Sequence, residues 1–222
     1  QPGEPELVIK LRKILEDEGI KIYTDAKVVK VHKENNKKIV TYEYAGETKE
    51  VSADEILLAV GKTPNTKDLG LEDIGVKINA KQAIVVDKLF QTSDPNIFAV
   101  GDVSSAPLRL ETTAGHEGTL VVDNAISGAK NSIDYNSVPY TIFTDPQFAS
   151  VGWTEERQMK ETGTCSCRTV SFEVIPKAQI IRRTEGLIKM VIDSKTKQIL
   201  GVHILAPNAG DLIAQASILI KN

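Results

Sequence analysis

The sequence predicts two mixed architectures in succession, an α/β part up to about residue 133 and an antiparallel α+β part after it. The first is indicated by two continuous apolar runs, Ile56–Val60, which ends in Gly61, and Ile97–Val100, which leads into Gly101-Asp102. Such runs are typical of strands buried on both faces of a parallel sheet. The second part is indicated by five short β-like segments with one helix among them.

In the first part, Leu7, Leu11 and Ile14 repeat at helical spacing before Gly19, which predicts a helix over residues 5–18. After this helix we expect short strands at 20–23, 27–33, 39–44, 49–52 and 84–86. A hairpin turn at Ala45-Gly46 is expected to join the strands 39–44 and 49–52. A second helix is expected over residues 111–127, closed by Gly128. In the second part we expect a helix at 154–162 and strands at 140–143, 149–153, 167–172, 186–193 and 199–205.

Composition excludes several classes of protein. The 222 residues carry a formal net charge of -3, so no basic field is available to hold nucleic acid or an anionic membrane. Apolar runs stop at about five residues, far below the roughly 20 that a spanning helix requires. We therefore expect neither nucleic acid nor a membrane as a partner. The two cysteines are few, which fits the reducing cytoplasm.

The ends of the sequence suggest that it is a piece of a longer protein. It begins with Gln1, and its two methionines, Met159 and Met190, are internal. The stretch 209–222 is still in apolar helical rhythm where the sequence stops. We therefore expect the chain to be excised, with the cut inside an element.

Asp102 is the first candidate site residue. A strand that ends in Gly-Asp delivers a carboxylate to the carboxyl end of a sheet, where α/β folds bind ligands. An ionised carboxylate can accept two hydroxyl donors, which suits a sugar or polyol chain, and Gly101 lets the backbone approach that ligand closely. The alternative is that Asp102 caps a turn.

The predicted helix after residue 110 is a weaker candidate. Its first amides, around Thr112 and Thr113, and the positive end of its dipole can stabilise negative charge on a ring oxygen or nitrogen. Ordinary helix starts have the same property. His116 lies one turn later, and we expect no ligand role for it.

Cys165 and Cys167 suggest a redox or metal pair, but we expect neither. On a strand their Cα atoms would stand about 6.6 Å apart, at the upper edge of disulfide geometry. Two thiols are also too few for a closed zinc site, which needs about four ligands, so no metal site is predicted. His32 and His203 are expected at the surface or half-buried, without a role.

Four blocks together resemble the carboxyl half of the pyridine nucleotide-disulfide oxidoreductases, the FAD enzymes that include lipoamide dehydrogenase and glutathione reductase. They are, in order, LLAVGKTPNT at 57–66, TSDPNIFAVGDV at 92–103, LETTAGHEG at 110–118 and YTIFTDPQFASVGWTE at 140–155. Within the family, FTDPQ with VGWTE, and the segments 182–193 and 201–213, look most like the mercuric reductase branch. The resemblance covers essentially the whole chain.

The resemblance implies three domain portions and a partner. Residues 1–66 would be the latter part of an NAD(P)-binding domain, 67–133 the returning part of an FAD-binding domain, and 134–222 most of an interface domain. This last portion would form a homodimer, with aromatic Phe143 and Trp153 in the core or at the subunit interface. The substrate would be a small molecule or a metal ion.

The resemblance also implies cofactor contacts. The family's ribityl-binding aspartate falls on Asp102, after Gly101, and its flavin-facing loop and helix start fall on Leu110, Glu111 and Thr112. Its glycine near the bound nucleotide falls on Gly61. Many members have Arg after that glycine, whereas Lys62 stands here and weakens any bidentate contact at that point.

Several family motifs are absent from the sequence. Neither GxGxxG turn is present, so we expect this chain alone to bind FAD or NAD(P)H poorly. The CxxxxC redox pair is also absent, so we expect no catalytic residue in this chain and no turnover by it alone. The predicted function is a portion of an FAD-dependent NAD(P)H oxidoreductase that reduces Hg(II), with dihydrolipoamide dehydrogenase as the alternative. Two alternatives from other classes stay open, a non-catalytic dimerisation module and a thiol metal sensor that uses Cys165 and Cys167.

Overall fold

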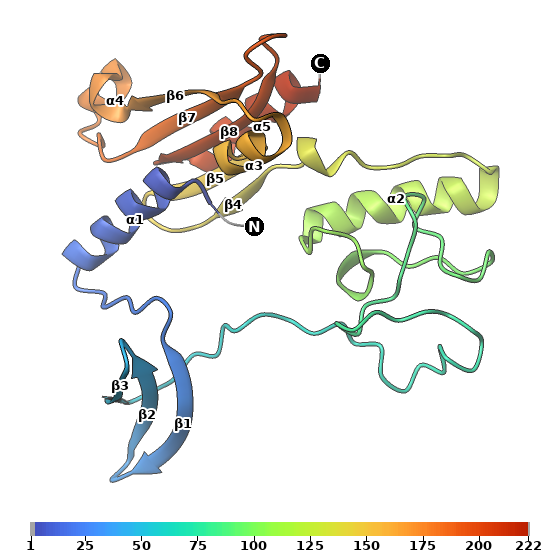
Figure 1. Ribbon diagram of the computed structural model, residues 1–222, viewed down its shortest axis with the longest axis horizontal. Helices are drawn as coiled ribbons and strands as arrows, with labels where there is room; N and C mark the ends of the chain where they lie inside the picture. Colours follow the sequence, from blue (N-terminus) through green and yellow to red (C-terminus); the bar gives the residue numbers. More distant parts are fainter. Residues whose placement is uncertain (1–2, 222) are drawn as a thin grey trace. The chain divides into compact units, whose positions relative to one another are not determined.

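The computed structural model describes residues 3–221, which form two compact units (Figure 1). One unit comprises the residues up to Leu11 together with those from Thr63 onward, and the other is Arg12–Lys62. Helix α1 (Pro5–Asp17) begins in the first unit and ends in the second. Gln1 and the end of the 209–222 stretch, on which the prediction of an excised chain rests, lie outside the described residues.

The 12–62 unit contains a three-stranded antiparallel sheet in the order β1 (Lys27–Glu34), β2 (Lys37–Tyr44) and β3 (Glu47–Ala53). The two turns, Asn35-Asn36 and Ala45-Gly46, have positive φ at both residues. This is the conformation that a two-residue hairpin turn requires, and Asn and Gly adopt it readily. The predicted ribbon and its hairpin at Ala45-Gly46 are confirmed.

The other unit is built on a five-stranded antiparallel sheet in the order β4-β5-β8-β7-β6. The strands are β4 (Tyr140–Ile142), β5 (Gln147–Gly152), β6 (Ser166–Ser171), β7 (Leu187–Ile192) and β8 (Ile199–Ala206). Each lies within a residue or two of a predicted strand, and all four pairings are antiparallel. The predicted antiparallel α+β half is confirmed.

Helix α5 (Ala209–Lys221) packs on β5 and β8, and Figure 1 shows it against that face of the sheet. Ile213 of this helix joins Val151, Val202 and Ile204 in the buried core. The other face carries a row of polar side chains, described below. None of the helices within residues 3–221 has the length and apolar character that crossing a bilayer requires.

Local signals set the remaining helices. Thr154 caps α3 (Glu155–Thr162), because its hydroxyl accepts a hydrogen bond from the amide of Arg157, and left-handed Gly163 ends that helix. Gly128 ends α2 (Glu111–Ser127) in the same way, as predicted. Short helices complete the fold: η1 (Gly101–Val103), η2 (Tyr135–Ser137), η3 (Phe172–Val174) and α4 (Pro176–Ile180).

The predicted buried strands of the first half are not formed. Residues 56–60 have no regular structure, and the side chains of Leu57, Leu58 and Val60 are 89%, 78% and 91% exposed. Residues 20–23 are also irregular, and 84–86 and 97–100 make only isolated bridges. A strand needs a continuous ladder of backbone hydrogen bonds to a neighbour. Residues 90–92 bond to 97–99, and residues 77–79 and 103–105 bond to 83–85, but these few bonds form no continuous ladder.

Gly201 marks a tight approach between β8 and the chain after β5. A Cβ there would overlap the carbonyl oxygen of Trp153 and stand 2.8 Å from its amide nitrogen. We expect Gly201→Ala to lower the free energy of unfolding by about 2 to 3 kcal/mol, because backbone atoms cannot move aside. Denaturant titration followed by circular dichroism measures this.

Gly118→Ala is the control, because nothing lies within 4 Å of its Cβ position on α2. It should stabilise by about 1 kcal/mol, and equal effects of the two changes would contradict the packing argument.

Candidate functional site

The turn at Gly101-Asp102 lies against helix α2. Gly101 is buried with φ +70°, a left-handed conformation that favours glycine, and a Cβ there would stand 3.2 Å from the Cβ of Ala114. Asp102 follows in η1 and is half-buried. A side chain at position 101 would therefore push η1, and with it Asp102, away from the helix.

Glu117 fastens this turn to α2. Its fully buried carboxylate accepts hydrogen bonds from the backbone amide of Gly101 (2.7 Å to Oε2) and from the hydroxyl of Tyr135 (2.7 Å to Oε1). These bonds offset the cost of removing the carboxylate from water. Burial, and then the bond to Glu117, raise the pKa of Tyr135, so its phenol stays a donor. No sequence motif marks Glu117, although it lies four residues after buried Thr113 and thus on the same face of the helix.

The amino end of α2 is open to a ligand. Leu110 is its N-cap residue and has no side-chain acceptor, so the first amides of the helix lack a capping side chain. Glu111 and Thr112 are exposed, and Leu110 is half-buried. One position further, the buried hydroxyl of Thr113 has no hydrogen-bond partner within the described chain. This end of the helix can therefore stabilise a negatively polarised group.

Five of the six predicted site residues thus lie in one unit, on η1 and at the start of the helix that η1 contacts: Gly101, Asp102, Leu110, Glu111 and Thr112. Gly61 lies in the 12–62 unit and has φ +102°. His116 is exposed on α2.

A second polar centre, which the sequence did not indicate, lies on the sheet face opposite α5. Lys189 of β7 is 1% exposed, and its ammonium group donates to Glu4 (2.8 Å), to Glu6 (2.8 Å) and to Glu155. Burial lowers the pKa of Lys189, but the three carboxylates outweigh it, so the pKa lies above its ordinary value. Its hydrogen bond in turn lowers the pKa of Glu6. Lys189 and Glu6 are therefore both charged at neutral pH, and the cluster joins the start of α1, α3 and the sheet.

His203 belongs to the same centre, and the prediction that it lies at the surface or half-buried is wrong. It is fully buried on β8 between Ser150 of β5 and Lys189 of β7, its partners in the sheet register. Its Nε2–H donates to the carbonyl oxygen of Trp153 (2.9 Å), so Nδ1 accepts from the Ser150 hydroxyl (2.6 Å). Burial lowers the pKa of His203, and the ring is neutral. The sequence of β8 gave no sign of this, because both faces of the strand are covered and its apolar residues therefore do not alternate with polar ones.

The two cysteines are joined. The structure contains a disulfide between Cys165 and Cys167, which the sequence analysis had judged unfavourable. Cys165 lies just before β6, outside the strand, and the two Cα atoms are 6.0 Å apart rather than the spacing of a regular strand. Both residues are half-buried.

Comparison with known proteins identifies the family. Residues 4–129 match the family model described as pyridine nucleotide-disulphide oxidoreductase, and residues 138–222 match its dimerisation domain. The chain belongs to the pyridine nucleotide-disulphide oxidoreductases. The resemblance in the four sequence blocks and the predicted mixed fold class are thereby confirmed, and a dimerisation domain is present.

Relatives of the family cover nearly the whole chain. A mercuric reductase of Streptomyces lividans is 38% identical over 218 residues, which are 98% of this chain and 46% of that protein. A dihydrolipoyl dehydrogenase of Thermus scotoductus is also 38% identical, over 99% of this chain and 47% of its own length. Among solved structures, the HOCl-induced flavoprotein disulfide reductase RclA from Escherichia coli superposes with a TM-score of 0.85 at 28% identity, covering 98% of this chain and 49% of that one. The chain thus spans about half the length of the relatives it matches.

Removal of the Lys189 ammonium should destabilise this unit strongly. Lys189→Met leaves the Glu4 carboxylate buried without its counter-charge, and we expect a loss of about 3 to 5 kcal/mol in the free energy of unfolding. Lys177→Met, which removes an exposed ammonium from α4, should change it by less than about 0.5 kcal/mol. Denaturant titration compares the two, and a similar small effect of both would show that the cluster contributes little.

Proposed function

We propose that this chain is part of an FAD-dependent oxidoreductase that takes electrons from NAD(P)H and works as a homodimer. The observation that carries this is the Gly101-Asp102 turn, which Glu117 holds against the uncapped start of α2. The turn offers a carboxylate for hydroxyl groups, and the helix start offers amide donors for a polarised ring. We propose the cytoplasm as its compartment, because the sequence has only two cysteines.

The residues present fit a flavin. Asp102 would accept hydrogen bonds from the ribityl hydroxyls, and Gly101 would let that chain approach the backbone. Leu110, Glu111 and Thr112 would face the ring at the start of α2, where the unpartnered hydroxyl of buried Thr113 adds a further polar atom. When bound, FAD supplies two-electron redox chemistry, and the helix start favours the negative charge of its reduced state. Gly61 would lie near the bound nucleotide.

The domain assignment follows the same proposal. Residues 1–66 would contribute to an NAD(P)-binding domain, 67–133 to the FAD-binding domain, and 134–222 to the dimer interface. Apolar side chains exposed in this last portion, among them Phe143 at 84%, are suited to burial against a second subunit.

For the substrate we propose Hg(II). The overall reaction converts NAD(P)H and Hg(II) to NAD(P)⁺, a proton and elemental mercury, so that two electrons are transferred. The motif likeness to the mercuric reductase branch and the Streptomyces lividans relative support this. Dihydrolipoamide is the second candidate substrate, because a dihydrolipoyl dehydrogenase has the same identity to the chain.

The flavin site is tested by Asp102→Ala in the intact protein that carries this chain. We expect FAD retention to fall by about tenfold or more, because a charged hydrogen-bond acceptor is lost, as measured by flavin absorbance per protein and by release on dilution. Asp123→Ala is the matched control, because it makes the same change at an exposed carboxylate of α2. Unchanged FAD retention in Asp102→Ala would refute the ribityl contact. A colourless, folded wild-type dimer would instead favour the dimerisation module.

The substrate is tested by NADPH oxidation in the intact protein with Hg(II) plus excess thiol, and by reduction of NAD⁺ with dihydrolipoamide. We expect oxidation of NADPH that depends on Hg(II), with release of mercury vapour, and a rate with dihydrolipoamide at least tenfold lower. The reverse preference would assign the protein to the dihydrolipoamide branch and overturn the proposal for Hg(II).

A further inference from the structure

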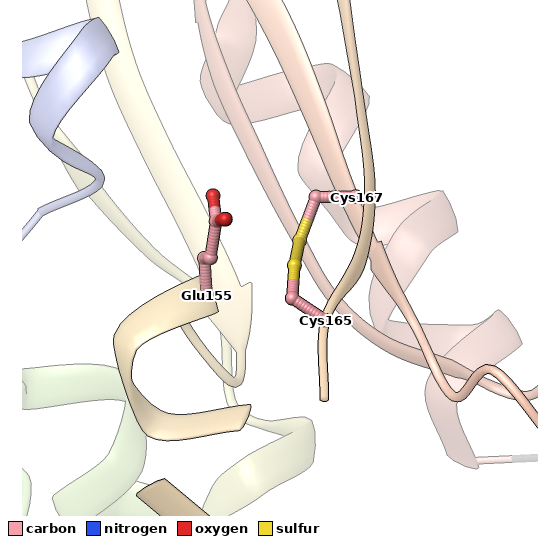
Figure 2. Close-up of side chains that lie close together, drawn as sticks. All are labelled: Glu155, Cys165 and Cys167. Carbon is pink, nitrogen blue, oxygen red and sulfur yellow. A yellow bond between two sulfur atoms is a disulfide. The ribbon is translucent and has the colours of Figure 1, made fainter. Parts of the chain in front are cut away.

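The fold brings a carboxylate to the cysteine pair. Figure 2 shows Glu155, from the first turn of α3, alongside the disulfide between Cys165 and Cys167. A carboxylate oxygen of Glu155 and the two sulfur atoms all lie within 4.8 Å of one another. All three residues are half-buried, so solvent and small solutes can reach them.

We propose that Cys165 and Cys167, once reduced, form with Glu155 a binding site for a divalent cation of the zinc type. Thiolate and carboxylate are both ligands of Zn²⁺, with bonds of about 2.3 Å to sulfur and 2.0 to 2.2 Å to oxygen. Ligand atoms on one tetrahedral ion therefore stand roughly 3 to 4 Å apart. The Glu155 oxygen already lies within 4.8 Å of both sulfur atoms, and reduction of the disulfide lets the sulfurs separate to that spacing. A water molecule supplies the fourth ligand.

The position of Glu155 favours a cation. Its Oε2 atom bonds the ammonium of Lys189, which leaves Oε1 available for a metal ion. Lys189 is surrounded by the carboxylates of Glu4, Glu6 and Glu155, so negative charge is in excess here. The ion pair also holds the Glu155 side chain in place, which reduces the entropy lost on binding.

Gln158, one turn further along α3, lies beside the sulfur atom of Cys167. It is 1% exposed, its amide group donates to the carbonyl of Ile192 (2.7 Å), and its Oε1 lies 3.9 Å from Sγ of Cys167. Because that amide is fixed by the sheet, its oxygen can accept a hydrogen bond from the reduced thiol of Cys167 and limit the movement of this side chain before the metal ion displaces the thiol proton.

The disulfide is then the closed, metal-free state of the site. Two molecules of a monothiol reductant, of the glutathione type, break the sulfur–sulfur bond, give two protein thiols and become a disulfide themselves. Zn²⁺ then displaces the two thiol protons. In the reverse direction, a disulfide of the glutathione type takes up the two electrons and leaves as two thiolates, while the bond between the cysteines forms again and the ion is released. Disulfide and metal therefore exclude each other at these sulfurs, and neither step needs flavin or nicotinamide.

The chain allows a test confined to these residues. Both cysteines lie in one tryptic peptide, Glu161–Arg168, so other thiols in the intact protein do not interfere. The intact protein is reduced, freed of reductant without oxygen, and alkylated with or without Zn²⁺. We expect Zn²⁺ to slow alkylation of both cysteines of this peptide at least tenfold in the reduced protein, and we expect no Zn²⁺ binding at these cysteines while their disulfide is intact.

Variants distinguish a site formed by both cysteines and Glu155 from binding of Zn²⁺ by the thiols alone. Cys165→Ser and Cys167→Ser should each abolish protection of the remaining thiol, and Glu155→Gln should weaken Zn²⁺ binding about tenfold or more. Glu156→Gln is the matched control, because it makes the same change at the exposed neighbouring residue and should bind as wild type. Circular dichroism checks the fold of each variant.

Two results would overturn the proposal. The first is equal alkylation of the reduced peptide with and without Zn²⁺. The second is equal Zn²⁺ protection in Glu155→Gln and in Glu156→Gln. That result would show that the two thiols bind Zn²⁺ without the Glu155 carboxylate. Both results are independent of FAD content and turnover, so they leave the proposed oxidoreductase function untouched.

Discussion

The buried ammonium of Lys189 is the constraint on which the five-stranded sheet and its surroundings depend. A charge on the inner face of a sheet is costly unless it is paired, and here carboxylates from the start of α1 and from α3 surround it. The same arrangement encloses the neutral ring of His203 and its bond to Ser150. One face of the sheet is thus held by polar pairing and the other by apolar packing against α5.

This pairing also orients the carboxylate beside the cysteine pair. Glu155 occupies the first turn of α3, whose start is set by the Thr154 cap, and Lys189 fixes its side chain from the sheet. A local capping signal and a distant ion pair thus act together on one residue. At the other end of the unit, Glu117 plays a comparable part, because it ties the Gly101 turn to α2 and to Tyr135.

Where local signals dominate, the sequence predicted the structure well. The helices at 5–17, 111–127 and 155–162 follow from apolar spacing, an N-cap threonine and left-handed glycines, all of which act within a few residues. The antiparallel strands follow from short segments between turns. The predicted buried strand at 56–60 did not form, and 97–100 makes only an isolated bridge, because apolar character alone does not supply a full ladder of backbone hydrogen bonds.

The sequence by itself determined the family, the antiparallel half and the residues of the Gly101-Asp102 turn, because these depend on contiguous motifs. Tertiary structure alone decided which side chains meet. Gly101 and Glu117 are 16 positions apart, and Glu4 and Lys189 are 185 apart, so no periodicity or motif connects them. Burial explains why such pairs form: once the chain removes a charge from water, it must provide a partner from wherever the fold brings one.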